Sequence, residues 1–146
     1  MKNWPRISIN MEKEFTRCFG CGQDNPIGLK LRFVKEGKIV RAGFTPSRLH
    51  QGWSGVLHGG ITMTLLDEAT SYATLLEGIN TITARLDVRL KRPIPVDQPL
   101  SITGNIVRRT RKTVETKGAV FLQDGTMAAE ADGIQFIVDA TREAEQ

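Results

Sequence analysis

The amino-acid sequence predicts an α+β domain in which one long helix packs against an antiparallel sheet. Residues 59–77 repeat their apolar side chains with the period of a helix. Shorter stretches before and after them alternate between apolar and polar residues, as half-buried strands do. The expected order of elements is β-β-α-β-β-β-β. Because helices and strands are not interleaved along the chain, this order disfavours a parallel doubly wound sheet.

The length and composition fit a single folded domain. The chain has 146 residues, of which 40% are hydrophobic and 25% charged. We expect an irregular leader over residues 1–28, the domain over residues 29–138 and a frayed tail over residues 139–146. No apolar run approaches the ~20 residues of a membrane span, and the first residues open no secretory signal. These features predict a soluble, cytoplasmic protein.

Two short strands are expected before the helix. Apolar and polar residues alternate over residues 29–34 and again over residues 40–44. Residues 36–38 between them centre on a glycine, which is typical of a hairpin turn. Proline and glycines then predict a loop over residues 45–57.

The helix expected over residues 59–77 separates apolar from polar residues. Seven apolar positions fall within one arc of about 140° when residues are placed 100° apart. The opposite side is rich in small hydroxyl residues rather than lysine, arginine or glutamine, which predicts close approach to a ligand or to a second subunit. A polar stripe with i, i+4, i+7, i+11 spacing contains Gly60, Thr64, Asp67 and Ser71. The hydroxyl residues are Thr62, Thr64, Thr70, Ser71 and Thr74.

Four strands are expected after the helix. Alternation predicts strands over residues 86–90 and 114–122, and β-branched residues predict one over residues 99–109. The last stretch, residues 127–138, alternates but changes phase at Gly133. We expect a β-bulge there.

The start of the helix is the candidate site. Gly59 and Gly60 weaken a helix by about 1 kcal/mol each relative to alanine. The N–H groups of a first turn have no acceptor within the helix, and the helix dipole is positive there. Glycine admits a ligand carbonyl close to these groups, as an oxyanion hole requires. Close packing of the glycines against a strand is the alternative interpretation.

The residues around this site resemble a known family. Residues 58–69, His58-Gly59-Gly60-Ile61-Thr62-Met63-Thr64-Leu65-Leu66-Asp67-Glu68-Ala69, resemble the H-G-G-x₄-[LA]-x-D motif of hot-dog-fold acyl-CoA thioesterases of the PaaI type, relatives of the 4-hydroxybenzoyl-CoA thioesterases. Residues 18–29 resemble the leader of one branch of this family, and residues 85–93 resemble its strand after the helix. The resemblance covers residues 18–138. It implies a hot-dog fold, a long central helix wrapped by a curved antiparallel β-sheet.

The resemblance also implies a reaction, the hydrolysis of an acyl- or aryl-CoA thioester to free acid and CoA without a cofactor. The Gly60 N–H, helped by Gly59, would polarise the thioester carbonyl. Asp67 would act as general base or nucleophile, and His58 would orient the start of the helix. Glu68, about 100° around the helix from Asp67, is the alternative carboxylate.

Gly60 and Asp67 are too far apart on one helix to act on the same atom. Seven residues separate them, which is about 10 Å at ~1.5 Å per residue. Two antiparallel helices across a dimer two-fold would bring Gly60 of one protomer to Asp67 of the partner subunit. We therefore expect a homodimer, or a dimer of dimers, with Thr64 and Ser71 lining active sites at the subunit interface.

Positive charge is concentrated in two clusters that suit a polyanionic partner, although solvated strand faces are the alternative. No aromatic residue interleaves the clusters, which disfavours nucleic-acid binding. We expect them to hold the phosphates of coenzyme A. The clusters are Arg85, Arg89, Lys91 and Arg92, and Arg108, Arg109, Arg111 and Lys112. The candidate phosphate ligands are Arg89, Lys91, Arg108, Arg109 and Arg111.

Cys18 and Cys21 do not predict a metal or redox site. A zinc site needs four ligands, and only His50 and His58, at an unusual spacing, could complete one. A redox pair normally opens a helix, which the Asn-Pro of residues 25–26 does not favour. We expect an unreactive leader and no metal.

Two other functions stay open on the same fold. A hydratase or dehydratase would pair a histidine with an acid, here His50 and Glu68, but leaves the double glycine unexplained. A non-catalytic acyl-CoA-binding module would keep the pocket without turnover.

Overall fold

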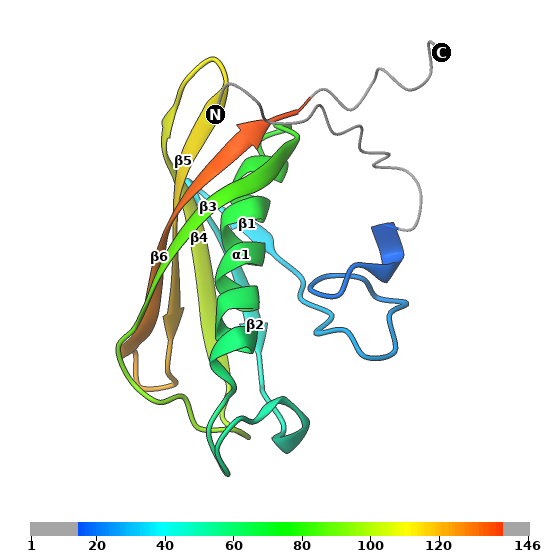
Figure 1. The fold of residues 1–146 in the computed structure, drawn as a ribbon, viewed down its shortest axis with the longest axis vertical. Coiled ribbons are helices and arrows are strands. Elements are labelled where there is room, and N and C mark those ends of the chain that lie inside the picture. Colours follow the sequence, from blue (N-terminus) through cyan, green and yellow to red (C-terminus); the bar gives the residue numbers. More distant parts are fainter. Residues whose placement is uncertain (1–14, 139–146) are drawn as a thin grey trace.

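A computed structural model describes residues 15–138 and confirms the predicted order of elements (Figure 1). The predicted tail and the first part of the predicted leader lie outside these residues. Within them, no helix has the length and apolar character needed to cross a membrane. The elements are η1 (Phe15–Arg17), β1 (Val34–Glu36), β2 (Ile39–Phe44), η2 (Arg48–His50), α1 (Gly59–Leu75), β3 (Thr81–Leu90), β4 (Leu100–Arg109), β5 (Thr113–Phe121) and β6 (Met127–Ile137).

All strand pairs are antiparallel and form one sheet in the order β1-β2-β4-β5-β6-β3. The sheet curves along one side of α1, and the leader lies on another side of the helix (Figure 1). This is the hot-dog arrangement that the resemblance implies. Because β3 is an edge strand, one side of the strand that follows α1 is unpaired within the described chain.

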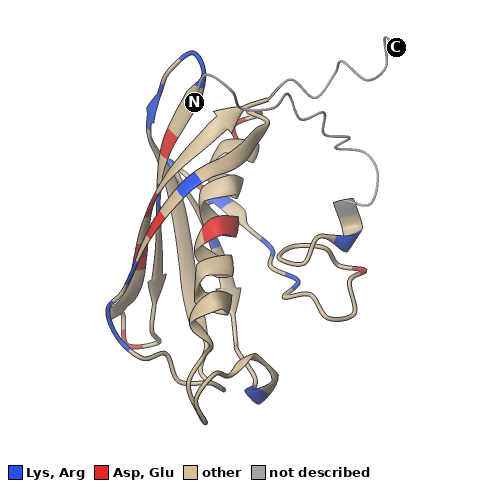
Figure 2. Cartoon of the chain, in the orientation of Figure 1, with Lys and Arg blue, Asp and Glu red and all other residues tan. Residues whose placement is uncertain are grey.

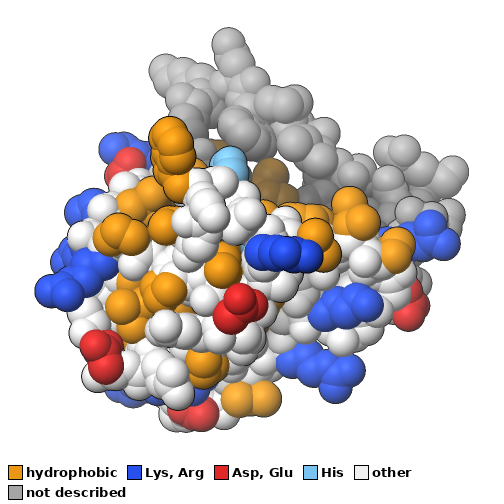
Figure 3. Space-filling view, turned by 90° about the horizontal axis from the view of Figure 1, so that it is seen from below, with side chains coloured by type: hydrophobic (Ala, Val, Ile, Leu, Met, Phe, Trp, Pro, Cys, Tyr) orange, Lys and Arg blue, Asp and Glu red, His pale blue; other side chains and the backbone are white. Residues whose placement is uncertain are grey.

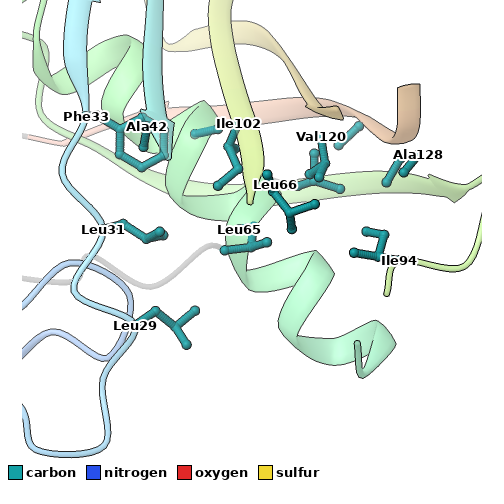
Figure 4. Packing of buried hydrophobic residues seen from close by; sticks show 14 of the residues in the cluster. Leu29, Leu31, Phe33, Ala42, Leu65, Leu66, Ile94, Ile102, Val120 and Ala128 are labelled. Atoms are coloured by element: carbon teal, nitrogen blue, oxygen red, sulfur yellow. The ribbon is translucent and has the colours of Figure 1, made fainter. Parts of the chain in front are cut away.

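The core lies between α1 and the middle of the sheet. Leu65 and Leu66 of α1 are fully buried and pack with Ile102 of β4 and Val120 of β5 (Figure 4). Burying one such side chain stabilises the fold by about 1.5–3 kcal/mol. The apolar arc predicted for the helix therefore faces the sheet.

Glycine allows the helix backbone to approach the sheet closely. A Cβ on Gly104 of β4 would overlap the main-chain carbonyl of Ala69 in α1. On Gly43 of β2, by contrast, the nearest atom to an added Cβ would be 3.9 Å away. Substitution by alanine should therefore destabilise the fold at Gly104 and leave its stability nearly unchanged at Gly43.

We expect Gly104→Ala to lower the free energy of unfolding by about 1–3 kcal/mol or more, because backbone must move to relieve the overlap. Gly43→Ala, the matched control on a neighbouring strand, should stay within about 0.5 kcal/mol of the parent. Urea denaturation followed by circular dichroism measures both. Equal stability of the two variants would contradict the close approach of α1 to β4.

The strand expected over residues 29–34 is only partly formed. Leu29 and Leu31 are buried as their alternation predicts, but they lie outside the sheet. The Leu29 N–H donates to the Phe19 carbonyl at 2.9 Å, and the Leu31 N–H donates to Gly20 at 3.0 Å. The alternation therefore predicts correctly that Leu29 and Leu31 are buried. Their main-chain N–H groups, however, donate to the leader and not to a neighbouring strand.

The bulge expected at Gly133 is wrong. The register of β6 against β5 is continuous at Gly133 and shifts only between Val120 and Phe121. Against β3, the register shifts between Thr83 and Arg85. The apolar pattern changes phase because two inward positions of β6 are a glycine and a glutamine. Gln135 is fully buried, and its Nε2 donates to Thr70 Oγ1 at 3.1 Å.

The predicted partner-facing role of the helix hydroxyls is wrong for Thr62, Thr70 and Thr74. All three are buried against the sheet of the same chain. The curved sheet therefore covers these threonines as well as the apolar residues of α1. Thr74 Oγ1 lies 2.7 Å from the Thr81 hydroxyl of β3, and Thr70 Oγ1 donates to the Asp67 carbonyl, so these two buried hydroxyls have partners within the chain. Of the predicted hydroxyl face, Thr64 and Ser71 remain half-buried.

Candidate active site

The first turn of α1 is capped by a histidine side chain. His58 is the N-cap residue, and its Nδ1 accepts the Gly60 N–H at 2.9 Å. The Ile61 N–H donates to the His58 carbonyl at 3.0 Å. Within residues 15–138, no acceptor takes the Gly59 N–H. The helix start therefore holds one free donor and a second donor bonded to an exposed ring.

A groove of about 360 Å³ opens beside these donors. Trp53, 88% exposed, stands at its wall, and His58 and Gly59 form the part next to the helix. Viewed from this end, hydrophobic side chains lie beside a histidine (Figure 3). The groove thus combines an apolar wall with main-chain N–H groups, a combination suited to an acyl group ending in a carbonyl.

Asp67 lies halfway along α1, on the same stripe as Gly60. Its Oδ1 accepts the Thr83 hydroxyl of β3 at 2.6 Å, and its side chain is half-buried. Acidic residues mark this part of the helix in Figure 2. Within one chain, Asp67 lies away from the helix start, because Gly60 and Asp67 are on the same helix and about 10 Å apart along its axis.

Glu68 points to the leader instead. Its Oε1 lies 3.8 Å from Cys18 Sγ, and a Cβ on Gly20 would overlap its side chain. Burial, and then the charge of Asp67, raise the pKa of the Glu68 carboxyl. The two adjacent carboxylates therefore have different surroundings. The sequence offered no signal for the contact of Glu68 with a segment about 50 residues earlier.

Thr64 and Ser71, which we expect at a subunit interface, lie on different parts of α1. Thr64 Oγ1 donates to the Gly60 carbonyl at 3.0 Å, within its own helix. Ser71 lines a cavity of about 130 Å³ together with Glu68 and Tyr72. The structure thus places Thr64 near the helix start and Ser71 beside the leader.

Arg89 and Lys91 are occupied by ion pairs. Arg89 Nε lies 2.8 Å from Glu130 and its Nη2 lies 2.7 Å from Asp132, while Lys91 Nζ lies 3.2 Å from Glu130. These side chains lie on neighbouring strands β3 and β6, and their charges are compensated locally. Exposed pairs of this kind contribute little to stability.

Arg108, Arg109 and Arg111 stand at the opposite end of α1 from Gly59. Arg108 and Arg109 end β4, and Arg111 lies in the turn before β5, at the top of Figure 2. Arg109 lines a cavity with Glu77, just beyond the end of the helix. The 17 residues of α1 span about 25 Å. Among the described residues, no carboxylate pairs with these three arginines.

Solved structures similar to this chain share its fold. A thioesterase superfamily protein, 28% identical, has a TM-score of 0.76; the match covers 81% of this chain and only 61% of that longer one. A hypothetical thioesterase of Streptococcus pneumoniae with coenzyme A, 20% identical, has a TM-score of 0.70 over 74% of this chain and 85% of that one. The PaaI protein of the E. coli phenylacetic acid degradation operon, 17% identical, has a TM-score of 0.71 over 76% and 81%.

Comparison with curated protein sequences found no significant match. The sequence profile of the thioesterase superfamily, however, matches residues 54–129, more than half of the chain. The matched segment begins in the loop before His58 and ends within β6, so it includes the helix start, both acidic residues of α1 and most of the sheet. With the hot-dog fold already evident from the sheet order, the chain belongs to the thioesterase superfamily.

Proposed function

We propose that the protein is an acyl-CoA thioesterase that hydrolyses an acyl- or aryl-CoA to the free acid and CoA. The observation that carries the proposal is the double-glycine start of α1, whose N–H groups border an apolar groove. Membership of the thioesterase superfamily supports it. So does the coenzyme A bound to one of the similar structures.

The N–H groups of Gly60 and Gly59 would polarise the thioester carbonyl. The Gly60 N–H becomes available when the exposed His58 ring turns away, which costs an N-cap bond of about 1 kcal/mol. A substrate carbonyl then replaces Nδ1 as the acceptor. One oxyanion donor contributes about 2.7–4 kcal/mol to the transition state, so the exchange favours reaction. His58 thus keeps the donor in place until substrate binds.

Asp67 would supply the base. The ionised carboxylate takes a proton from water as the water oxygen attacks the thioester carbon, and the carbonyl oxygen becomes an oxyanion at the helix start. When the carbonyl reforms, the C–S bond breaks and the CoA thiolate takes the proton that Asp67 accepted from water, so CoA leaves as a thiol and the carboxylate is restored. Direct attack by the carboxylate, giving an anhydride that water then hydrolyses, is the nucleophilic version. In both, the Thr83 hydroxyl fixes the orientation of Asp67.

The complete site would form between two chains. Gly60 and Met63 are exposed on α1, and Asp67 is half-buried on the same side. An antiparallel pair of α1 helices would place Gly60 of one protomer by Asp67 of the partner subunit. It would also place Arg108 of the partner subunit, with its neighbours, near the first turn of α1 that contains Gly60. Coenzyme A phosphates bound there would meet arginines that no carboxylate in residues 15–138 neutralises.

We expect Arg108→Ala with Arg109→Ala to raise KM for acyl-CoA more than it lowers kcat, most strongly at low salt. N-acetylcysteamine thioesters lack the nucleotide and should be unaffected. Arg17→Ala with Arg32→Ala, which removes one charge from the leader and one from the segment that follows it, is the matched control. Steady-state kinetics at two salt concentrations measure these effects. Equal losses with both kinds of thioester would contradict phosphate binding by these arginines.

A panel of acyl- and aryl-CoA thioesters, incubated with the protein and a thiol reagent, tests the proposed function. Release of CoA thiol supports hydrolysis. Hydration of an enoyl-CoA without CoA release would assign the protein to the hydratases instead. Saturable binding without turnover, followed by calorimetry, would make it an acyl-CoA-binding module.

A further inference from the structure

Three potential metal ligands meet where the leader crosses α1. The Sγ atoms of Cys18 and Cys21 and a carboxylate oxygen of Glu68 all lie within 4.8 Å of one another. Cys21 is buried, and the other two are half-buried. None of the three belongs to the reaction proposed above. The cluster therefore needs its own explanation.

Two glycines shape the leader so that the sulfurs reach the helix. The Gly22 N–H donates to the Cys18 carbonyl at 2.8 Å and closes the turn that carries both cysteines. A Cβ on Gly22 would overlap the backbone of that turn, and a Cβ on Gly20 would overlap Glu68. The close approach of the cysteines to the carboxylate is therefore built into this turn.

Among the described residues, no lysine, arginine or histidine forms an ion pair with Glu68. Metal ions bind cysteine as the thiolate and glutamate as the carboxylate. A divalent cation at this position would therefore displace the protons of these groups and compensate the negative charge of the cluster.

We propose that Cys18, Cys21 and Glu68 bind a zinc ion that fastens the leader to α1. Zn–S bonds of about 2.3 Å and Zn–O bonds of about 2.1 Å separate sulfur from oxygen by about 3.6 Å in a tetrahedron. Cys18 Sγ and Glu68 Oε1 are already 3.8 Å apart. Thiolate ligands favour zinc over magnesium or calcium.

The fourth ligand is a water molecule. The three protein ligands border the cavity of about 130 Å³, which Ser71 and Tyr72 also line. This space is large enough for water, and the hydroxyl groups offer it hydrogen bonds. Three protein ligands with a water in the fourth position is the coordination known from catalytic zinc sites, whereas structural sites usually have four protein ligands.

The test titrates the full chain with Zn²⁺ in competition with a chromophoric chelator, in reductant and without substrate. We expect one Zn²⁺ per chain, and a thiolate-to-cobalt charge-transfer band when Co²⁺ replaces it. Cys18→Ser, Cys21→Ser and Glu68→Gln should each weaken Zn²⁺ binding at least tenfold. Glu77→Gln is the matched control, since this glutamate follows the same helix and pairs with Lys35. It should bind like the parent.

Several results would overturn the proposal: no Zn²⁺ binding by the parent, no charge-transfer band, or equal affinity in parent and Glu68→Gln. If the cysteine variants do not fold, alkylation of the parent decides. Zn²⁺ should protect both thiols from iodoacetamide, and undiminished labelling would count against coordination. Because no substrate is present, failure here leaves the proposed thioesterase reaction untouched.

Discussion

Asp67→Asn should lower the rate of acyl-CoA hydrolysis at least about a hundredfold while the protein stays folded. A general base contributes typically 10²–10⁴-fold, and the amide that replaces the carboxylate cannot take a proton from water. The amide oxygen can still accept the Thr83 hydroxyl, so the local geometry should persist. Single-turnover kinetics with saturating enzyme measure the chemical step, and thermal unfolding checks the fold.

Glu68→Gln is the control for this prediction, because the two carboxylates are adjacent in sequence but lie against different partners. Its rate should stay within a few-fold of the parent. Near-parental turnover by Asp67→Asn together with an inactive Glu68→Gln would transfer the role of base to Glu68.

Mixing two inactive variants should restore activity if each site takes Gly60 from one chain and Asp67 from the other. Gly60→Pro removes an oxyanion donor of the kind that contributes about 2.7–4 kcal/mol. Proline is tolerated in the first turn of a helix, and the His58 ring that it would approach is exposed. A heterodimer of Gly60→Pro and Asp67→Asn contains one site with both defects and one with neither. It should show up to about half of the parental activity.

Hydrolysis is measured before and after subunit exchange, with native mass spectrometry to count heterodimers. Two differently tagged samples of Asp67→Asn, exchanged with each other, are the control and should stay inactive. If heterodimers of the two different variants form and activity stays absent, the shared site does not exist.

The fold was predictable because its strongest signals are local. The helix period over residues 59–77 and the alternation of the strands need no knowledge of distant contacts. The errors arose where tertiary contacts decide. Gln135 reads as an outward residue, yet it is fully buried because Thr70 accepts a hydrogen bond from its amide. Thr62 reads as exposed, yet the curved sheet covers it.

The candidate site, too, was predictable from the sequence only in part. The glycines and Asp67 lie in one continuous motif, so the sequence could nominate them together. Whether two chains combine them depends on an interface that residue spacing only suggests. For the cysteines, the sequence suggests only the two histidines as further ligands. The fold brings Glu68 to them from 50 residues away, across the face of a helix.

The hydrogen bonds beneath Asp67 connect its side chain to its own backbone. Thr83 can donate to Asp67 Oδ1 at 2.6 Å or to Gln135 Oε1 at 3.4 Å, and Gln135 donates to Thr70, which donates to the Asp67 carbonyl at 3.0 Å. One hydroxyl proton serves only one acceptor at a time. While the Asp67 carboxylate is ionised, it accepts the hydrogen bond of the Thr83 hydroxyl. When Asp67 has taken a proton from water, the Thr83 hydroxyl can donate to Gln135 instead. In the reaction that we propose, the charge on the half-buried Asp67 carboxylate would thereby select between two hydrogen-bond arrangements in the interior, and β6 would help to orient the proposed base.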